Sequence, residues 1–256
     1  MRRSAIVTGG AGGIGLATVT RLLRQDVDVM LVDANEEEAS KVATKFSTDR
    51  LAISIADVTN AAQAADVVDK TVSRFGGVDI LVNVAGGAGP VKVHEIEAIE
   101  PDTWDLVMNL NVRSVYLYCK AVMPYMRARS YGRIVNISST LARGEKGPPT
   151  TVAARLPYAT AKAALIGMTS QLAKDVASDG ITVNALLPGL ILGDKGTRIR
   201  ARFEALPEEQ RLSIMAGYPI GRPGEADEVA VAIEFLVSEA AGYVTGTAIP
   251  VDGGYL

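Results

Sequence analysis

The stretch from Ser4 to Asp33 constrains the fold more than any other part of this sequence. It reads SAIVTGGAGGIGLATVTRLLRQDVDVMLVD, a short apolar run, a glycine-rich turn, apolar residues at helical spacing, and a second apolar run ending in an acid. This order and length are typical of one strand–helix–strand unit with parallel strands. The unit predicts an α/β fold.

The glycine-rich turn has the chemistry of an anion cradle. Glycines tolerate positive φ and let the backbone approach a bulky anion, while the helix that follows points unpaired N–H groups at it. Asp33 lies 18 residues beyond Gly15, where a carboxylate can accept hydrogen bonds from an adenosine ribose diol. We therefore predict dinucleotide binding, although a glycine pattern by itself also describes a plain tight turn.

Two motif registers fit the turn. The general G-x-G-x-x-G pattern uses Gly10, Gly12 and Gly15. The alternative, T-G-x-x-x-G-x-G, uses Thr8, Gly9, Gly13 and Gly15.

Composition narrows the function classes. The 256 residues show no linker or repeat, so we expect a single domain over 1–256. A formal charge of −3 gives no general attraction to nucleic acid or membrane, and no apolar run spans a bilayer. Cys119 is the only cysteine, which fits a cytoplasmic protein, and His94 is the only histidine, which argues against a metal site or a Ser-His-Asp mechanism.

Apolar runs continue the alternation of strands and helices. Strand-like segments cover 51–56, 80–82, 133–137 and 182–187, with helical patterns between them. We expect a Rossmann-type doubly wound parallel sheet of about seven strands with helices on both faces. A helix at 61–75 is capped by Asp57 or Asn60, and a long helix at 101–129 contains Asn111 and a kink near Pro124.

A tyrosine and a lysine near residue 160 supply candidate acid–base chemistry. Tyr158 and Lys162 are four residues apart near the start of a predicted helix and so share a face. A cation close to a phenol favours the phenolate and lowers its pKa towards neutrality. Ser138 and Ser139 end the strand at 133–137, and a serine hydroxyl can donate to the same substrate oxygen.

These motifs together resemble the short-chain dehydrogenase/reductase family, in its compact single-domain form. The resemblance covers essentially the whole chain, to the closing segment GTAIPVDGG at 246–254, and favours the T-G-x-x-x-G-x-G register. Two departures are visible: Val84 stands where the family usually has a second Asn, and no Thr closely follows Gly189.

The resemblance implies the site residues. The catalytic set is Ser139, Tyr158, Lys162 and Asn111, with Ser138 the less favoured serine. The implied cofactor-binding residues are Thr8, Gly9, Gly13, Ile14, Gly15, Asp33, Asp57, Val58, Asn83, Ala85, Gly86, Tyr158, Lys162, Pro188, Gly189 and Ile191. Among these, Asp57 is implied to sit beside the adenine, and Asn111 to order a water beside Lys162.

Cofactor and substrate follow from charge. Asp33 would repel a 2′-phosphate and no Arg or Lys stands beside it, so we expect NAD(H). A Pro/Gly-rich insertion at 141–157 and a lid at 190–218 are expected to shape the substrate site. Arg143 and Arg198 are candidates to bind an anionic substrate, with a solvated helix face or a subunit contact as the alternative.

The sequence thus predicts an NAD(H)-dependent oxidoreductase that interconverts a secondary alcohol and a ketone by hydride transfer, with Tyr158 as acid or base. A ketoacyl or sugar keto reductase of the same family is one alternative, and a non-catalytic NAD(H)-binding regulatory protein is another. The expected partner is a small alcohol or ketone, with no nucleic acid, membrane or metal. Family habit suggests a homotetramer.

Overall fold

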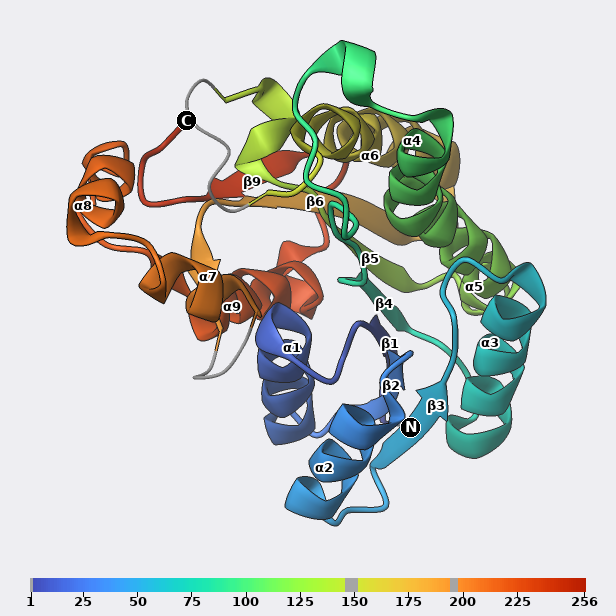
Figure 1. Ribbon diagram of the computed structural model, residues 1–256. Coiled ribbons are helices and arrows are strands. Elements are labelled where there is room, and N and C mark those ends of the chain that lie inside the picture. The colour runs from blue at the N-terminus through green and yellow to red at the C-terminus, as the bar shows by residue number, and fades with distance from the viewer. Residues whose placement is uncertain (1, 146–151, 194–197) are drawn as a thin grey trace.

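The computed structural model describes residues 2–145, 152–193 and 198–256, apart from the side chain of residue 198. Within this part of the chain, seven parallel strands form one sheet in the order β3-β2-β1-β4-β5-β6-β9 (Figure 1). The strands are β1 (Ser4–Thr8), β2 (Asp28–Asp33), β3 (Leu51–Ile55), β4 (Ile80–Asn83), β5 (Gly132–Ile137), β6 (Ile181–Pro188) and β9 (Ala248–Val251). The predicted doubly wound sheet is confirmed.

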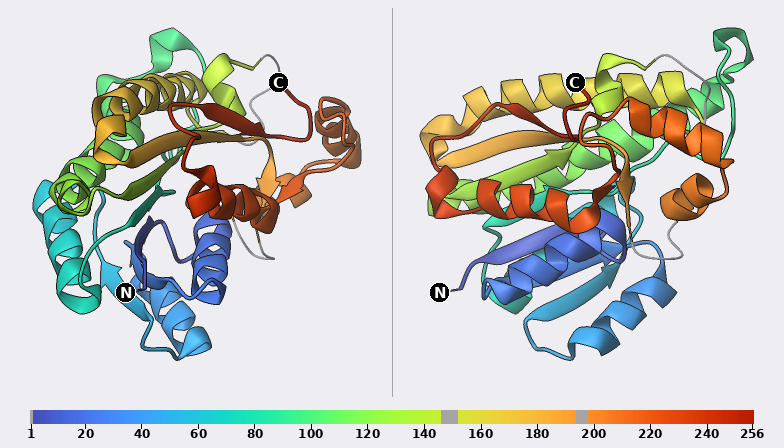
Figure 2. Two further views of the ribbon diagram at one scale, coloured as in Figure 1. Left: turned by 180° about the vertical axis from the view of Figure 1, so that it is seen from behind. Right: turned by 90° about the vertical axis from the view of Figure 1, so that its left-hand side faces the viewer.

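Helices cover both faces of the sheet (Figures 1 and 2). One face carries α1 (Gly13–Arg24), α2 (Glu36–Phe46) and α9 (Ala226–Leu236). The other carries α3 (Ala61–Phe75), α4 (Pro101–Met108), α5 (Ser114–Arg129) and α6 (Arg155–Val176). Buried strand residues alternate between two apolar clusters, since Ala5 and Val7 belong to one and Ile6 to the other. Strand geometry requires this alternation when both faces of a sheet are covered.

The strand order reverses between β1 and β4, where the chain leaves one half of the sheet for the other. Thr8 pairs with Asn83 at the carboxyl end of both strands, so the segments that follow them start side by side. Doubly wound sheets bind ligands in the crevice at such a reversal. The glycine-rich turn after β1 and the segment 83–86 at the end of β4 therefore meet at the edge of the sheet where a ligand is expected.

Smaller elements extend beyond this edge of the sheet. Helices α7 (Arg198–Glu204) and α8 (Glu208–Ala216) lie at the end opposite the N-terminus, as the right-hand view of Figure 2 shows. A two-stranded parallel ribbon of β7 (Ile191–Leu192) and β8 (Gly224–Glu225) carries them. The predicted lid, 190–218, thus begins next to β7, and the chain that follows it returns to the ribbon at β8.

The predicted helix at 101–129 is interrupted. A π-helical turn, Asn109–Arg113, separates α4 from α5, and it holds Asn111, whose side chain is fully buried. A kink is expected near Pro124, but the helix changes type at 109–113 instead. Helix α5 runs through Pro124 as α-helix. A π-turn inserts one residue into the hydrogen-bond ladder, which explains how an asparagine is accommodated in mid-helix.

The predicted helix 61–75 forms as expected, with one of its two candidate caps, whereas the start of α6 differs from the prediction. Asn60 caps α3 by accepting hydrogen bonds from Ala62 and Gln63, whereas Asp57 accepts from Thr59 and does not cap the helix. Helix α6 begins at Arg155, so the last residues of the predicted insertion 141–157 form its first turn. Residues 146–151 of that insertion lie outside the described part of the chain.

We expect Asp79 to be important for stability. Its buried carboxylate accepts hydrogen bonds from the Ser4 amide (2.8 Å) and from Arg129 (2.8 Å), which joins the start of β1 to the end of α5. Asp79→Ala leaves both donors without this acceptor and should cost about 3 kcal/mol in urea unfolding. Asp179→Ala, which removes an exposed ion pair with Arg127, is the matched control and should cost about 0.5 kcal/mol. Equal losses would contradict this role of Asp79.

Candidate functional site

The glycine-rich turn leaves room for a bulky anion. Gly9 and Gly13 have positive φ values of 65° and 49°, and a Cβ on Gly9 would lie 2.9 Å from the amide nitrogen of Ala85. A Cβ on Gly12 or Gly13, in contrast, would meet nothing within 4 Å. Helix α1 begins here with no side-chain cap, so no capping side chain takes up its first N–H groups. These features fit a dinucleotide pyrophosphate.

Thr8 joins the glycine turn to the end of β4. Its hydroxyl oxygen accepts hydrogen bonds from the amides of Val84 (3.1 Å) and Ala85 (3.2 Å). The side chain therefore holds two backbone segments together and is occupied within the chain. Substitution of the usual second Asn by Val84 leaves this contact intact, because the contact uses the backbone N–H.

Asp33 is held in a fixed orientation at the end of β2. Its carboxylate accepts hydrogen bonds from the amides of Ala11 (3.1 Å) and Asn35 (3.0 Å), and the side chain is half-buried. Glu36 and Glu37 lie with Asp33 around one open depression. The negative charge at this edge is therefore concentrated where the ribose of a dinucleotide would bind.

Two other candidate cofactor residues lie differently from each other. The Asn83 side chain is buried and donates to Asn136 (2.9 Å), so it faces the interior rather than the site. Asp57 is exposed at the end of β3, followed by the buried Val58. Of the two polar residues, only Asp57 presents its side chain to solvent.

The candidate catalytic residues converge beyond the ends of β4 and β5. Lys162 is almost fully buried on α6, and its Nζ donates to the Ile137 carbonyl (2.8 Å) and lies 5.5 Å from the centroid of the Tyr158 ring. A Cβ on Gly86 would lie 3.2 Å from Lys162 Nζ and 2.6 Å from Asn111 Oδ1. The Asn111 side chain also binds the Gly87 backbone twice, because its Oδ1 accepts from the Gly87 amide and its Nδ2 donates to the Gly87 carbonyl. Asn111, Gly86 and Lys162 therefore meet at one point.

The structure distinguishes the two serines. Ser138 Oγ donates to the backbone carbonyl of Lys162 (2.7 Å), which ties β5 to α6. Ser139 is hydrogen-bonded to the Tyr158 side chain and also accepts from the Leu141 amide (3.2 Å) at the start of a 3₁₀ turn, Thr140–Arg143. Ser139 is thus the serine beside Tyr158.

The protonation states differ from the sequence-based expectation. Burial raises the pKa of Tyr158 to about 12, and the hydrogen bond with Ser139 only partly offsets this rise. Burial also lowers the pKa of Lys162 to about 8. The expected lowering of the phenol pKa by the cation is wrong for this state of the protein, because burial dominates the shift and Lys162 is not among its causes.

The segment after β6 is held by backbone and side-chain groups together. Gly189 donates to the Val251 carbonyl (3.1 Å), and Leu190 donates to the hydroxyl of Tyr218 (3.0 Å). Pro188 ends β6, and Ile191 begins β7. The loop that carries the candidate cofactor residues Gly189 and Ile191 is therefore anchored at Gly189 and Leu190.

The candidate substrate residues fall in different positions. Arg143 ends the 3₁₀ turn that starts after Ser139 and is exposed. Arg198 begins α7, but its side chain lies outside the described atoms. Both residues remain proposals for anion binding.

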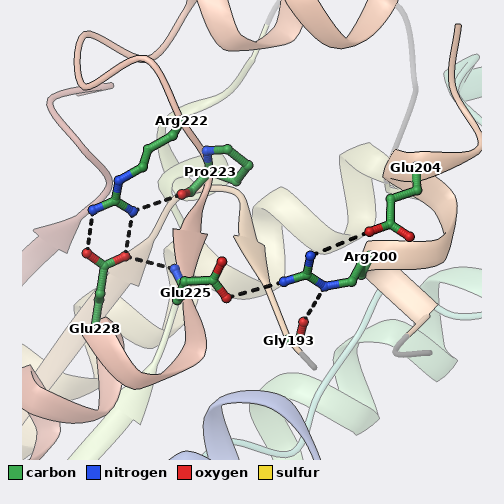
Figure 3. Close-up of polar contacts among 7 residues, drawn as sticks. All are labelled: Gly193, Arg200, Glu204, Arg222, Pro223, Glu225 and Glu228. Atoms are coloured by element: carbon green, nitrogen blue, oxygen red, sulfur yellow. Dashed lines mark hydrogen bonds and ion pairs between the residues drawn. The ribbon is translucent and has the colours of Figure 1, made fainter. Parts of the chain in front are cut away.

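Arg200, another cation of the predicted lid, forms hydrogen bonds and ion pairs with other residues of the protein (Figure 3). Its guanidinium donates to the Gly193 carbonyl (2.6 Å) and pairs with Glu204 and Glu225. Glu225 is the N-cap of α9 in a capping box with Glu228, which in turn pairs with Arg222 (2.7 Å). Arg200 therefore fastens α7 to the ribbon that carries it.

Comparison with known proteins places the chain. A family model described as enoyl-(acyl carrier protein) reductase matches residues 9–256. The chain belongs to the short-chain dehydrogenase/reductase family. Two similar members are 2-(S)-hydroxypropyl-CoM dehydrogenase 3 of Xanthobacter autotrophicus (37% identity over 250 residues, covering 97% of this chain and 94% of that protein) and 3-oxoacyl-[acyl-carrier-protein] reductase FabG of Salmonella typhimurium (37% over 250 residues, 98% and 96%).

A solved short-chain dehydrogenase/reductase structure has the same fold over its full length. ElxO with NADP bound superposes with a TM-score of 0.88 at 28% identity, covering 100% of this chain and 99% of that one.

Two further findings concern the described residues of the present protein. None of its helices is long and apolar enough to cross a bilayer, and no group of three or more His, Cys, Asp or Glu side chains is placed to hold a metal ion.

Sequence reasoning missed some residues of this short-chain dehydrogenase/reductase site. Tyr218 and Arg200 act on loop backbones, and no motif surrounds either residue. A cue for Arg200 was its position among four cations with one acid at 194–202. A cation cluster alone does not show which partners it binds, and Arg200 pairs with Glu225, which lies 25 residues away. The sequence does not show which of these side chains lie close to which backbone segments in the folded protein.

Lys162 should reduce the stability of the protein at neutral pH. Because burial lowers its pKa from 10.5 to about 8, the protonated form is penalised fully below about pH 8, and the penalty vanishes as the pH rises to 10.5. Lys162→Met should stabilise the protein by about 2 kcal/mol at pH 7, with the lost Ile137 hydrogen bond deducted. The gain should disappear in urea unfolding at pH 10.5.

The exposed Lys174, also on α6, provides the control for this experiment. Lys174→Met should leave stability unchanged within about 0.5 kcal/mol at either pH. A destabilised Lys162→Met protein at pH 7 would show that Lys162 is not held at a cost.

Proposed function

We propose that this protein is an NAD(H)-dependent oxidoreductase that interconverts a secondary alcohol and a ketone. The observation that carries the proposal is the convergence of Ser139, Tyr158 and Lys162 beside the open glycine cradle. When bound, the nicotinamide would accept or supply the hydride. The family supports an oxidoreductase, and the finer assignment of cofactor and substrate is ours.

In this proposal Tyr158 exchanges the proton of the substrate oxygen. A raised pKa keeps the phenol protonated at neutral pH, so it is ready to donate during ketone reduction. In alcohol oxidation it must receive the proton, and a protonated Lys162 beside it would favour the required phenolate. Ser139, already hydrogen-bonded to Tyr158, would hold the same oxygen.

The cofactor-binding residues keep the roles expected of them. Gly9, Gly13, Ile14 and Gly15 would cradle the pyrophosphate, while Asp57 and Val58 would flank the adenine. Backbone groups of Asn83, Ala85, Gly86, Pro188, Gly189 and Ile191 would line the rest of the dinucleotide. Asn111 lies in a π-turn, and we propose that it orders a water beside Lys162.

The alternative is a reductase of ketoacyl substrates. It is supported by the similarity to FabG, which is a 3-oxoacyl-[acyl-carrier-protein] reductase. The anionic-substrate proposal for Arg143 rests on its exposed position at the end of the 3₁₀ turn that follows Ser139. Substrate panels for testing the protein should include neutral alcohols, anionic alcohols and 3-ketoacyl thioesters.

Turnover of that panel tests the function, with NADH absorbance followed in both directions. We expect activity with at least one class and a loss of at least about 1000-fold in kcat for Tyr158→Phe, because the proton exchanged at the substrate oxygen then has no donor or acceptor. Tyr116→Phe, at an exposed position on α5, is the control and should keep wild-type activity. An unaffected Tyr158→Phe protein would exclude the mechanism, and NADH binding without any turnover would favour a regulatory protein.

Cofactor preference can be reversed at the end of β2. The Asp33→Ala, Ala34→Arg double variant replaces the carboxylate with a guanidinium at an exposed position, so the NADPH/NADH ratio of kcat/KM should rise by roughly 100-fold or more. Glu37→Gln, an exposed acid beside the same depression, should change the ratio by less than about threefold. A wild-type protein that prefers NADPH would overturn the NAD(H) proposal.

A further inference from the structure

We propose that Tyr218 is a positioning residue for the nicotinamide half of the cofactor, and that the C-terminal tail holds Tyr218 in place through Tyr255. The inference rests on the proposed function, because it takes the loop after β6 to pass the nicotinamide. It adds a residue outside the expected catalytic and cofactor sets.

Tyr218 replaces a strand partner where the sheet ends. The pairing of β6 with β9 stops at Gly189, which donates to Val251. The next amide, on Leu190, donates to the Tyr218 hydroxyl (3.0 Å), and the Leu190 carbonyl accepts from Gly224 (2.9 Å). Both backbone polar groups of Leu190 are therefore fixed, one of them by a side chain.

The Tyr218 ring also packs directly on the loop. A Cβ on Gly189 would lie 2.9 Å from Cε1 of this ring, so only a glycine allows the approach without a shift. Behind the loop, a cavity of about 80 Å³ is lined by Leu190, Ile191, Tyr218, Val251 and Asp252, among others. Side-chain packing is incomplete on that side. The Tyr218 contacts therefore restrain the loop where packing does not.

The C-terminal tail fixes Tyr218. The Tyr218 and Tyr255 rings stack with centroids 4.7 Å apart and an interplanar angle of 26°. Asp252 shapes the tail by accepting hydrogen bonds from the amides of Gly254 (3.0 Å) and Leu256 (2.9 Å). The tail also meets the segment beside Tyr218, since Ile220 donates to the Gly253 carbonyl (3.1 Å).

Tyr255 extends the connection to the segment that follows the catalytic serine. Its hydroxyl donates to the Glu145 carboxylate (3.3 Å), and Glu145 lies just beyond the 3₁₀ turn that Ser139 begins. Burial raises the pKa of Tyr218 to about 12 and, as the largest influence, also raises that of Tyr255, so both hydroxyls stay protonated at neutral pH. The tail thus bridges the loops that follow β5 and β6.

Two ligands separate a positioning role from a general structural one. NADH contains the nicotinamide, whereas ADP-ribose has the same adenosine and pyrophosphate but lacks that ring. In Tyr218→Phe the stack remains, but the half-buried Leu190 amide loses its acceptor and the loop should shift. Calorimetry should then show NADH binding weakened roughly tenfold and ADP-ribose binding unchanged within about twofold.

Matched variants complete the experiment. Tyr125→Phe removes a hydroxyl that donates to Asp69 on the surface and should leave both affinities unchanged. Tyr255→Ala removes the stack from the tail side, should weaken NADH selectively by roughly threefold, and tests the inference even if Tyr218→Phe folds poorly.

The outcomes distinguish this inference from the function it rests on. Equal weakening of both ligands in Tyr218→Phe, or a lowered melting temperature with both affinities kept, would overturn the positioning role while leaving the proposed function standing. A wild-type protein that binds ADP-ribose and NADH equally would overturn it as well. A wild-type protein that binds neither ligand would overturn the proposed function and this inference with it.

Discussion

The close approach of two backbones at the carboxyl ends of β1 and β4 is the constraint on which the rest of the site depends. Gly9 lies so near Ala85 that a side chain would collide with its amide, and the Thr8 hydroxyl binds the amides of Val84 and Ala85. This contact sets the position of the glycine cradle relative to the strand end that leads to Gly86. Because Gly86 in turn touches Lys162 and Asn111, the cradle and the candidate catalytic cluster share one rigid base.

The candidate catalytic cluster buries two ionisable side chains, Tyr158 and Lys162, and burial disfavours the charged form of each. Burial lowers the pKa of Lys162 to about 8 and raises that of Tyr158 to about 12, although the proposed chemistry uses a cation and, in one direction, a phenolate. Perturbed titration of this kind is common at functional sites, where stability is given up for reactivity. The Ser138 hydrogen bond to the Lys162 carbonyl ties β5 to α6 at this point and involves no charged group.

The sequence predicted the parts of this structure that depend on local pattern. Alternating apolar runs located the strands, and the glycine turn with Asp33 located the cradle, because these features are written in consecutive residues. The π-turn around Asn111 was not predicted, since nothing local distinguishes one inserted residue from a regular helix. The pKa of Tyr158 was also misjudged, because spacing along a helix reveals a neighbouring cation but not the extent of burial.

Contacts between segments distant in the sequence explain what remained hidden on the lid side. Arg200 binds Gly193 and Glu225, and Tyr218 binds Leu190, so each fastens an irregular segment to the ribbon or strand end beside it. Neither contact has a sequence motif, because Glu225 lies 25 residues from Arg200 and Leu190 lies 28 residues from Tyr218. The cradle edge of the site is fixed by close backbone approach together with the Thr8 hydroxyl, whereas the proposed substrate edge is fixed mainly by individual polar side chains. A side chain can be exchanged without disturbing the sheet, and we infer that substrate choice can change at this edge while the cradle stays the same.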